Sequence, residues 1–136
     1  MKIFLDTSAI IAIYNADDKF HDDASSVMRD ISTGRVPLTR FYVSDYIFDE
    51  AMTFIECVLQ DHRLAQEVGE ALLSSPFTIM LRVDDEVSQE SWDRFKASRG
   101  RSFTDCSSFV LMERNGVNHA FSFDEHFMEE GFHILN

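Results

Sequence analysis

Four acidic residues stand where the chain passes between apolar, strand-like runs and helix-like segments. Asp6 and Asp124 each directly follow a short apolar run, Glu50 lies early in a helix-like segment, and Asp105 begins another. Carboxylates gathered at one place repel one another strongly, so such a cluster needs a cation. No histidine or cysteine has matching placement, and all-oxygen ligation favours Mg²⁺ or Mn²⁺ over zinc. Because Mg²⁺ commonly completes its shell with water and substrate phosphate oxygens, the four acids predict metal-dependent phosphoester chemistry.

These acids converge only if the strands that carry them run parallel. Strand-length apolar runs occupy residues 3–5, 41–43, 77–83, 120–123 and 132–135, and helical spacing is found in residues 8–15, 21–32, 45–59, 62–74, 85–97 and 104–114. Strands that alternate with helices favour a parallel sheet, because the crossover between parallel strands is usually a helix. The sequence therefore predicts a doubly wound α/β fold, in which ligands bind at the carboxyl ends of the strands.

Two of the acids also have a purely structural interpretation. Asp6 is a suitable N-cap for the helix that follows it. Thr104 is a suitable N-cap for the later helix, and Asp105 would then lie in the first turn, where the helix dipole favours an acid. Capping and metal binding both remain open for these positions.

Glu50 and Asp49 are adjacent, and helical geometry separates them. Positions 47, 51, 54 and 58 form an apolar helix face, with Glu50 at its margin and Asp49 farther from it. We therefore expect Glu50 to point toward the other acids and Asp49 to be solvated, although a change of register would exchange the two.

The composition limits the organisation and the partners of the chain. With 136 residues, 45% of them hydrophobic, and no linker or repeat, the chain is predicted to be a single domain over residues 1–136. The net charge of −12 repels nucleic acid at long range, so any such partner must be held locally. No signal peptide or membrane-spanning run is present, and Cys57 and Cys106 fit buried thiols in a reducing compartment. We expect a cytoplasmic protein without membrane contact.

The ordered motifs resemble a known family. The motifs are Ile3-Phe4-Leu5-Asp6-Thr7-Ser8-Ala9-Ile10-Ile11, Asp49-Glu50, Ser102-Phe103-Thr104-Asp105-Cys106-Ser107 and Phe121-Ser122-Phe123-Asp124-Glu125-His126-Phe127. Together they look like a PIN-domain ribonuclease, and most closely like the VapC-type toxins of toxin–antitoxin pairs. The resemblance covers essentially the whole chain. It implies a PIN-like three-layer α/β/α sandwich with a five-stranded, mostly parallel sheet.

The resemblance also implies an activity and its residues. It implies a Mg²⁺- or Mn²⁺-dependent endoribonuclease that leaves a 5′-phosphate and a 3′-hydroxyl, a VapB-type antitoxin partner and a homodimer. The residues that match the family's metal-site acids are Asp6, Glu50 and Asp105, with Asp124 as the fourth, more variable acid. Thr7 or Thr104 would be a polar helper near the site.

A cluster of basic residues precedes the third acidic motif. Its members, Arg94, Lys96, Arg99 and Arg101, are candidates for holding the RNA backbone, although a solvated helix face and loop explain them equally well. Trp92, Phe95 and Phe103 are candidates for stacking on bases, but the helical spacing of Trp92 and Phe95 favours packing in the core. The scattered histidines, including His126, are expected to pack or face water.

Other functions remain open at this point. A phosphatase with Asp6 as nucleophile would need a second aspartate two residues later, where Ser8 stands. A phospho-receiver domain would need an acidic pair after the first strand and a lysine after the last, and neither is present. A non-catalytic interaction module would keep the acids as helix caps and bind no metal. A PIN-domain nuclease that processes RNA without an antitoxin is a further alternative.

Overall fold

The computed structural model describes residues 1–37 and 40–136. Within these residues, five strands form one sheet in the order β3-β2-β1-β4-β5, and every neighbouring pair is parallel. The strands are β1 (Lys2–Leu5), β2 (Arg40–Ser44), β3 (Thr78–Leu81), β4 (His119–Phe121) and β5 (His133–Leu135). The predicted α/β fold with a five-stranded, mostly parallel sheet is confirmed.

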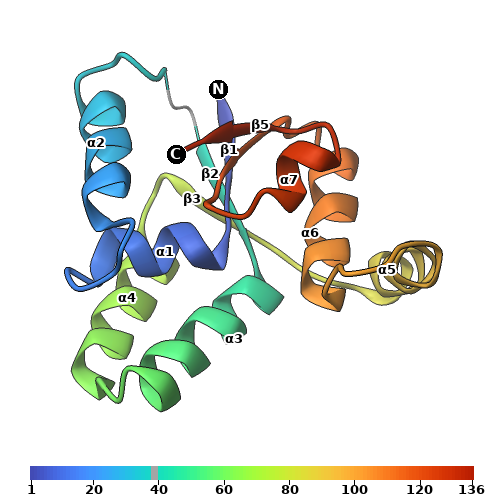
Figure 1. Cartoon of the computed structure of the whole chain (residues 1–136), viewed down its shortest axis with the longest axis horizontal. Helices are drawn as coiled ribbons and strands as arrows, with labels where there is room; N and C mark the ends of the chain where they lie inside the picture. The colour runs from blue at the N-terminus through green and yellow to red at the C-terminus, as the bar shows by residue number, and fades with distance from the viewer. Residues whose placement is uncertain (38–39) are drawn as a thin grey trace.

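Helices cover both sides of this sheet. They are α1 (Thr7–Tyr14), α2 (His21–Ser32), α3 (Asp45–Thr53), α4 (His62–Ser74), α5 (Asp85–Ala97), α6 (Phe103–Arg114) and α7 (His126–Glu129). In Figure 1, α1, α2 and α4 lie on one side of the sheet and α6 and α7 on the other, while α5 packs against α6. None of the described helices is both long and apolar enough to span a membrane.

The central strand β1 determines where the acids lie. Ile3, Phe4 and Leu5 are almost fully buried, as expected of a strand that is covered on both faces. β1 pairs with β2 on one side and with β4 on the other, so the chain reverses its direction of travel across the sheet at this strand. The crevice at such a reversal, at the carboxyl edge, is the usual ligand site of open α/β sheets. Asp6 follows β1 at this edge.

Several boundaries differ from the sequence expectations. The predicted helix over residues 45–59 ends as an α-helix at Thr53 and continues as a π-helical turn, η1 (Phe54–Val58). This turn is followed by Gln60 with a φ of 55°, which ends the helix and allows α4 to fold back beside α3. The strand predicted over residues 77–83 is limited to Thr78–Leu81, and the short helix α7 was not predicted.

The two cysteines differ in exposure. Cys106 is buried as predicted, whereas Cys57 is exposed on η1, and neither forms a disulfide. The expectation that both thiols are buried was therefore wrong, because the π-helical turn rotates Cys57 outward to the wall of a surface groove.

Candidate metal-dependent nuclease site

Asp6 is held rigidly at the carboxyl end of β1. The residue is only 5% exposed, and its Oδ2 accepts hydrogen bonds from the Ser8 hydroxyl at 2.8 Å and from the Ser122 hydroxyl at 2.8 Å. It occupies the N-cap position of α1 but makes no side-chain capping bond, so capping does not explain it. Burial raises the pKa of Asp6 from 3.8 to about 6, the two serine hydroxyls oppose this shift, and the negative charge of Asp105 adds to it.

Asp105 combines the two interpretations that the sequence left open. Ser102, not Thr104, is the N-cap of α6, because its hydroxyl accepts a bond from the Asp105 backbone N–H at 2.9 Å. The Asp105 carboxylate accepts a bond from the Ser102 backbone N–H in return, which completes a capping box. The same Oδ2 lies 3.3 Å from Nδ1 of His126. The cap therefore fixes the carboxylate while leaving it directed at the site.

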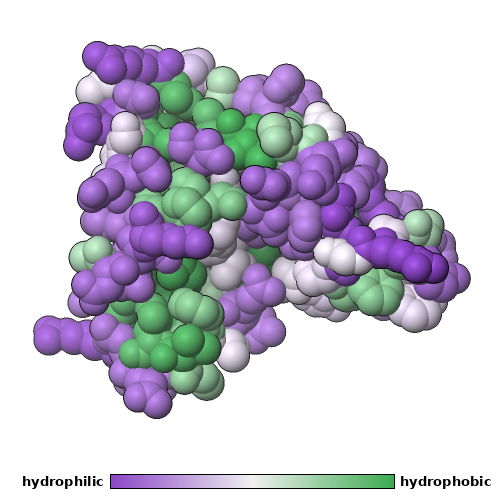
Figure 2. Space-filling view, in the orientation of Figure 1, coloured by the Kyte–Doolittle hydropathy of each residue, from purple (hydrophilic) through white to green (hydrophobic). Residues whose placement is uncertain are grey.

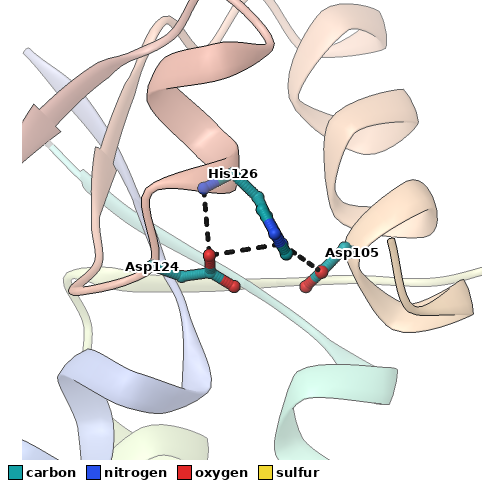
Figure 3. A group of neighbouring side chains, drawn as sticks. All are labelled: Asp105, Asp124 and His126. Carbon is teal, nitrogen blue, oxygen red and sulfur yellow. Dashed lines mark hydrogen bonds and ion pairs between the residues drawn. The ribbon is translucent and has the colours of Figure 1, made fainter. Parts of the chain in front are cut away.

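Asp124 and His126 complete this side of the site. The Asp124 Oδ1 accepts a hydrogen bond from the His126 backbone N–H at 2.9 Å, and the His126 Nδ1 lies 3.3 Å from that oxygen. Figure 3 shows the imidazole between the carboxylates of Asp105 and Asp124, which come from α6 and from the loop after β4. A histidine therefore does lie among the acids, contrary to the sequence expectation for His126.

Glu50 faces the three aspartates from α3. It lines a pocket of about 330 Å³ together with Asp6, Asp105 and Asp124. Glu50 and its neighbour Asp49 are both exposed and both line an adjacent pocket, but only Glu50 also lines the pocket of the aspartates. The structure thus brings the four sequence-selected acids to one pocket at the carboxyl edge of the sheet.

The donor set of this pocket suits a hard divalent cation. Its polar lining is predominantly carboxylate oxygen, which Mg²⁺ and Mn²⁺ prefer. One ligand atom from each of Asp105, Asp124 and His126 lies within 4.8 Å of the other two, which is close enough for these residues to hold one ion. The buried hydroxyl oxygen of Thr7, a residue that lines the pocket, has no hydrogen-bond partner among the described residues. The pocket therefore offers both ligands and an unsatisfied polar atom.

Comparisons with known proteins agree with this arrangement. The family model described as PIN domain matches residues 3–131. The chain belongs to the PIN-domain family. The 23S rRNA-specific endonuclease VapC20 of Mycobacterium tuberculosis, in strains CDC 1551 / Oshkosh and ATCC 25618 / H37Rv, is 29% identical over 134 residues, which are 96% of this chain and 95% of the relative.

A solved structure is similar over the same length. The crystal structure of Mycobacterium tuberculosis VapC20, described as a sarcin-ricin loop cleaving toxin, superimposes on this PIN domain with a TM-score of 0.83 and 26% identity. The match covers 96% of this chain and 95% of that one. The resemblance to VapC-type PIN-domain ribonucleases that the motifs indicated is confirmed.

The polar helpers occupy different places in this PIN domain. Thr7 lines the pocket that contains the four acids, whereas Thr104 lines the adjacent pocket beside Glu50 and Asp49. The backbone carbonyl of Thr104 accepts bonds from the hydroxyls of Ser107 and Ser108, so the residue also helps to build the first turns of α6.

The basic cluster is largely neutralised by neighbouring acids. Arg94 forms ion pairs with Glu113 at 2.9 Å and Glu130 at 2.8 Å, and Arg101 forms ion pairs with Glu129 at 2.6 Å and Glu130 at 3.3 Å. These arginines lower the pKa of Glu130 by hydrogen bonding and by their charge. The two arginines therefore join α5 and the α5–α6 loop to α6 and α7.

The other members of the basic cluster are more accessible. Lys96 lies 3.5 Å from Asp93 and above the ring of Trp92, and Arg99 is exposed in the loop before α6. Trp92 and Phe95 stack on each other but are 47% and 37% exposed. The expectation that both aromatic residues belong to the core was wrong, because α5 packs mainly on α6 and leaves this face open.

Sequence reasoning missed three residues that shape the site. Ser122 follows β4 and is fully buried, and its hydroxyl joins Asp6 to the strand that leads to Asp124. Ser8 makes the matching bond from the first turn of α1. His126 lies two residues after Asp124. A serine within three residues of the end of each central strand was the available signal for Ser8 and Ser122.

Proposed function

We propose that this PIN domain is a Mg²⁺- or Mn²⁺-dependent endoribonuclease that hydrolyses RNA phosphodiester bonds. The metal ligands in this proposal are Asp6, Glu50, Asp105 and Asp124. The observation that carries it is that these acids, from four separate segments of the chain, line one pocket at the carboxyl edge of the sheet. The naming of full-length relatives as rRNA endonucleases supports RNA as the substrate.

The residues around the acids have separate tasks. Ser8 and Ser122 hold the Asp6 carboxylate in one orientation, and the capping box does the same for Asp105. The buried hydroxyl of Thr7 is available to bond a water or a phosphate oxygen that enters the pocket. A bound divalent ion would supply an activated water and stabilise the charge that develops on the departing oxygen.

His126 positions two of the acids. Its Nδ1 lies within 3.3 Å of carboxylate oxygens of Asp105 and Asp124, and its backbone N–H fixes Asp124. Its place between them keeps both groups directed at the same volume. Loss of a residue that orients a metal ligand commonly weakens metal affinity by about 10- to 100-fold.

A structured rRNA hairpin is the proposed substrate class. The relative is named for 23S rRNA and its structure for the sarcin-ricin loop, and the match covers almost all of both chains. Recognition of such a loop depends on its shape and its unpaired bases, and an unpaired nucleotide could reach the pocket of about 330 Å³ at the edge of the sheet. A substrate within the ribosome also supports the expected cytoplasmic location.

The test of this function couples metal binding to cleavage. Mn²⁺ is titrated by calorimetry into the wild type and into an Asp6→Asn, Asp105→Asn double variant, and both are assayed on a sarcin-ricin hairpin and on a pool of structured RNA. The proposal predicts that binding and cleavage are lost together while circular dichroism shows a folded variant. Wild-type protein that binds no metal and cuts no RNA would establish an interaction module instead.

We also propose a VapB-type antitoxin as partner, bound in an apolar groove between α3, η1 and α4. The groove has a volume of about 720 Å³ and is lined by Phe48, Met52 and Leu73, of which Leu73 is 62% exposed. Figure 2 shows hydrophobic residues gathered over the α3–α4 hairpin at the lower left. Glu56 and Glu70 line the same groove, so an apolar segment flanked by Lys or Arg fits it best.

A small reading frame directly upstream is the candidate gene for this antitoxin. Co-expression with its product should yield a complex in which RNA cleavage is inhibited. Failure of that product to co-purify or to inhibit would count against the antitoxin and leave the nuclease proposal intact.

Homodimer formation is a further proposal, and the open face of α5 supports it. Trp92 and Phe95 stack on each other there and are 47% and 37% exposed, so they offer apolar surface to a second copy of the chain. Light scattering of the wild type should give about twice the chain mass of 15.7 kDa, and Trp92→Lys should reduce it to the monomer mass. A monomeric wild type at micromolar concentration would contradict the proposal.

A further inference from the structure

The proposed activity faces an electrostatic obstacle. The chain carries a net charge of −12, and the pocket is lined by five carboxylates, those of Asp6, Asp18, Glu50, Asp105 and Asp124. Even with metal ions bound, an approaching phosphate meets a strongly negative surface. A free cation at the pocket itself would favour RNA most directly.

Most basic side chains near the site are already engaged. Arg94 and Arg101 are paired with glutamates of α6 and of the segment that includes α7, and Lys96 is paired with Asp93. Arg114 is likewise held between Glu86 and Glu90, and Arg99, which is exposed in the loop before α6, does not line the pocket. A cation that already faces an acid contributes little net attraction for a phosphate.

Lys19 differs from these residues because it lines the pocket and has no acidic partner within the described part of the chain. Among the described residues that line the pocket of the four acids, Lys19 alone is a lysine or arginine. No carboxylate of the described residues forms an ion pair with it, although Asp18 is its neighbour. The side chain is exposed, and its Nζ lies 4.9 Å from the centre of the Phe20 ring. The ammonium group is therefore free to bind an anion at the mouth of the pocket.

The segment that carries Lys19 is anchored to the site. The Phe20 ring stacks on Phe123, with ring centres 4.6 Å apart and planes 5° apart, and Phe123 directly precedes Asp124. The Phe20 backbone N–H donates to the Asp18 carboxylate at 2.9 Å, and the His21 Nδ1 lies 2.8 Å from the carbonyl oxygen of Ala12. These contacts hold the backbone on both sides of Lys19, so less conformational freedom is lost when Lys19 binds an anion.

We propose that Lys19 contacts a non-bridging phosphate oxygen of the RNA beside the scissile bond and holds the substrate against the metal-binding acids. The inference rests on the proposed nuclease function. Lys19 would act by a charge-assisted hydrogen bond, and one ammonium on a flexible stem suits a single phosphate without base recognition. Lys19 therefore contributes to RNA affinity and to the position of the RNA backbone in the site, whereas other contacts determine sequence specificity.

Single-turnover cleavage separates binding from the chemical step. A labelled sarcin-ricin hairpin is incubated with increasing enzyme at several KCl concentrations, which gives a half-saturating enzyme concentration and a maximal rate. For Lys19→Gln we expect the half-saturating concentration to rise about tenfold, the size expected for losing a charged hydrogen bond. The slope of log affinity against log salt should become shallower by about 0.7 to 1. The maximal rate should stay within about threefold of wild type.

Two further variants make the result specific. Lys19→Arg keeps the charge and should retain wild-type affinity and salt slope. Lys2→Gln removes the same charge at the opposite, amino end of β1, where its Nζ donates to the Asn115 carbonyl at 3.1 Å, and should leave both quantities unchanged. Equal losses of RNA affinity in Lys19→Gln and Lys2→Gln would show that only the net charge of the protein matters, and would overturn the inference.

The remaining outcomes are also decisive. If the wild type cleaves the RNA and Lys19→Gln has the same half-saturating enzyme concentration, the inference is overturned and the proposed function stands. A loss confined to the maximal rate does so as well, because a phosphate contact outside the reacting bonds acts on binding. Absence of wild-type cleavage at every metal and salt concentration overturns the proposed function and the inference together.

Discussion

Replacing Asp6 by asparagine should stabilise the metal-free protein while removing its function. Burial raises the pKa of Asp6 from 3.8 to about 6, so the folded state binds this proton more tightly than the unfolded state does. Between these two pKa values the folded state holds more protons, and its stability falls as pH rises. Above pH 6 the full penalty is present, and the shift corresponds to about 3 kcal/mol.

Asparagine keeps the acceptor oxygen for Ser8 and Ser122 but carries no charge. In EDTA at pH 7.5, urea unfolding of Asp6→Asn should therefore give a free energy of unfolding up to about 3 kcal/mol above that of wild type. At pH 4.5 the difference should shrink to about 1 kcal/mol, because Asp6 of folded wild type is then almost entirely protonated and no charge is buried. The exposed control Asp49→Asn should stay within about 0.5 kcal/mol of wild type at both values.

Metal should reverse the order of stability. Saturating Mn²⁺ stabilises only a protein that binds it, so wild type should gain with metal concentration and Asp6→Asn should not. Destabilisation by Asp6→Asn in EDTA at pH 7.5, or a difference that does not change with pH, would refute the reasoning. Either result would mean that the serine hydroxyls outweigh the cost of burying the carboxylate.

Four more outcomes are expected. Mn²⁺ affinity measured by calorimetry should fall by up to about tenfold per pH unit below 6 and level off above 7, because protons compete for Asp6; affinity that does not change down to pH 5 would contradict this. His126→Ala should weaken Mn²⁺ binding by about 10- to 100-fold in a folded protein, and unchanged affinity would remove its positioning role. Arg94→Gln should lower the melting temperature, since Glu113 loses its partner and Glu130 keeps only Arg101, and an unchanged melting temperature would show that the Arg94 pairs are not needed. Leu73→Arg should weaken antitoxin binding and leave RNA cleavage intact, whereas unchanged antitoxin affinity would place the partner elsewhere.

Much of the fold and the place of the site could be predicted because they depend on local patterns. Apolar runs that alternate with helical periodicity specify a parallel sheet, and a parallel sheet brings the ends of its strands to one edge. Asp6 directly follows β1, and Asp124 lies three residues after the end of the neighbouring strand β4, so their convergence follows from the topology. Glu50 was separated from Asp49 by helical phase alone.

The remaining features depend on tertiary contacts that no local pattern contains. The π-helical turn at Phe54–Val58 and the exposure of Cys57 depend on how α3 packs against α4. Arg94 and Arg101 looked like an RNA-binding cluster because their glutamate partners are distant in sequence. His126 entered the site through a short helix with little periodicity of its own.

The central claim is that the four acids hold a divalent cation for RNA cleavage, and anomalous diffraction from crystals soaked in Mn²⁺ tests its metal-binding part most directly. The account predicts a manganese peak within about 2.5 Å of carboxylate oxygens of Asp6 and Asp105, in the pocket that Glu50 and Asp124 also line. The peak should be absent from crystals of Asp6→Asn, Asp105→Asn. A wild-type pocket without manganese at saturating concentration, or a peak bound only elsewhere, would contradict it.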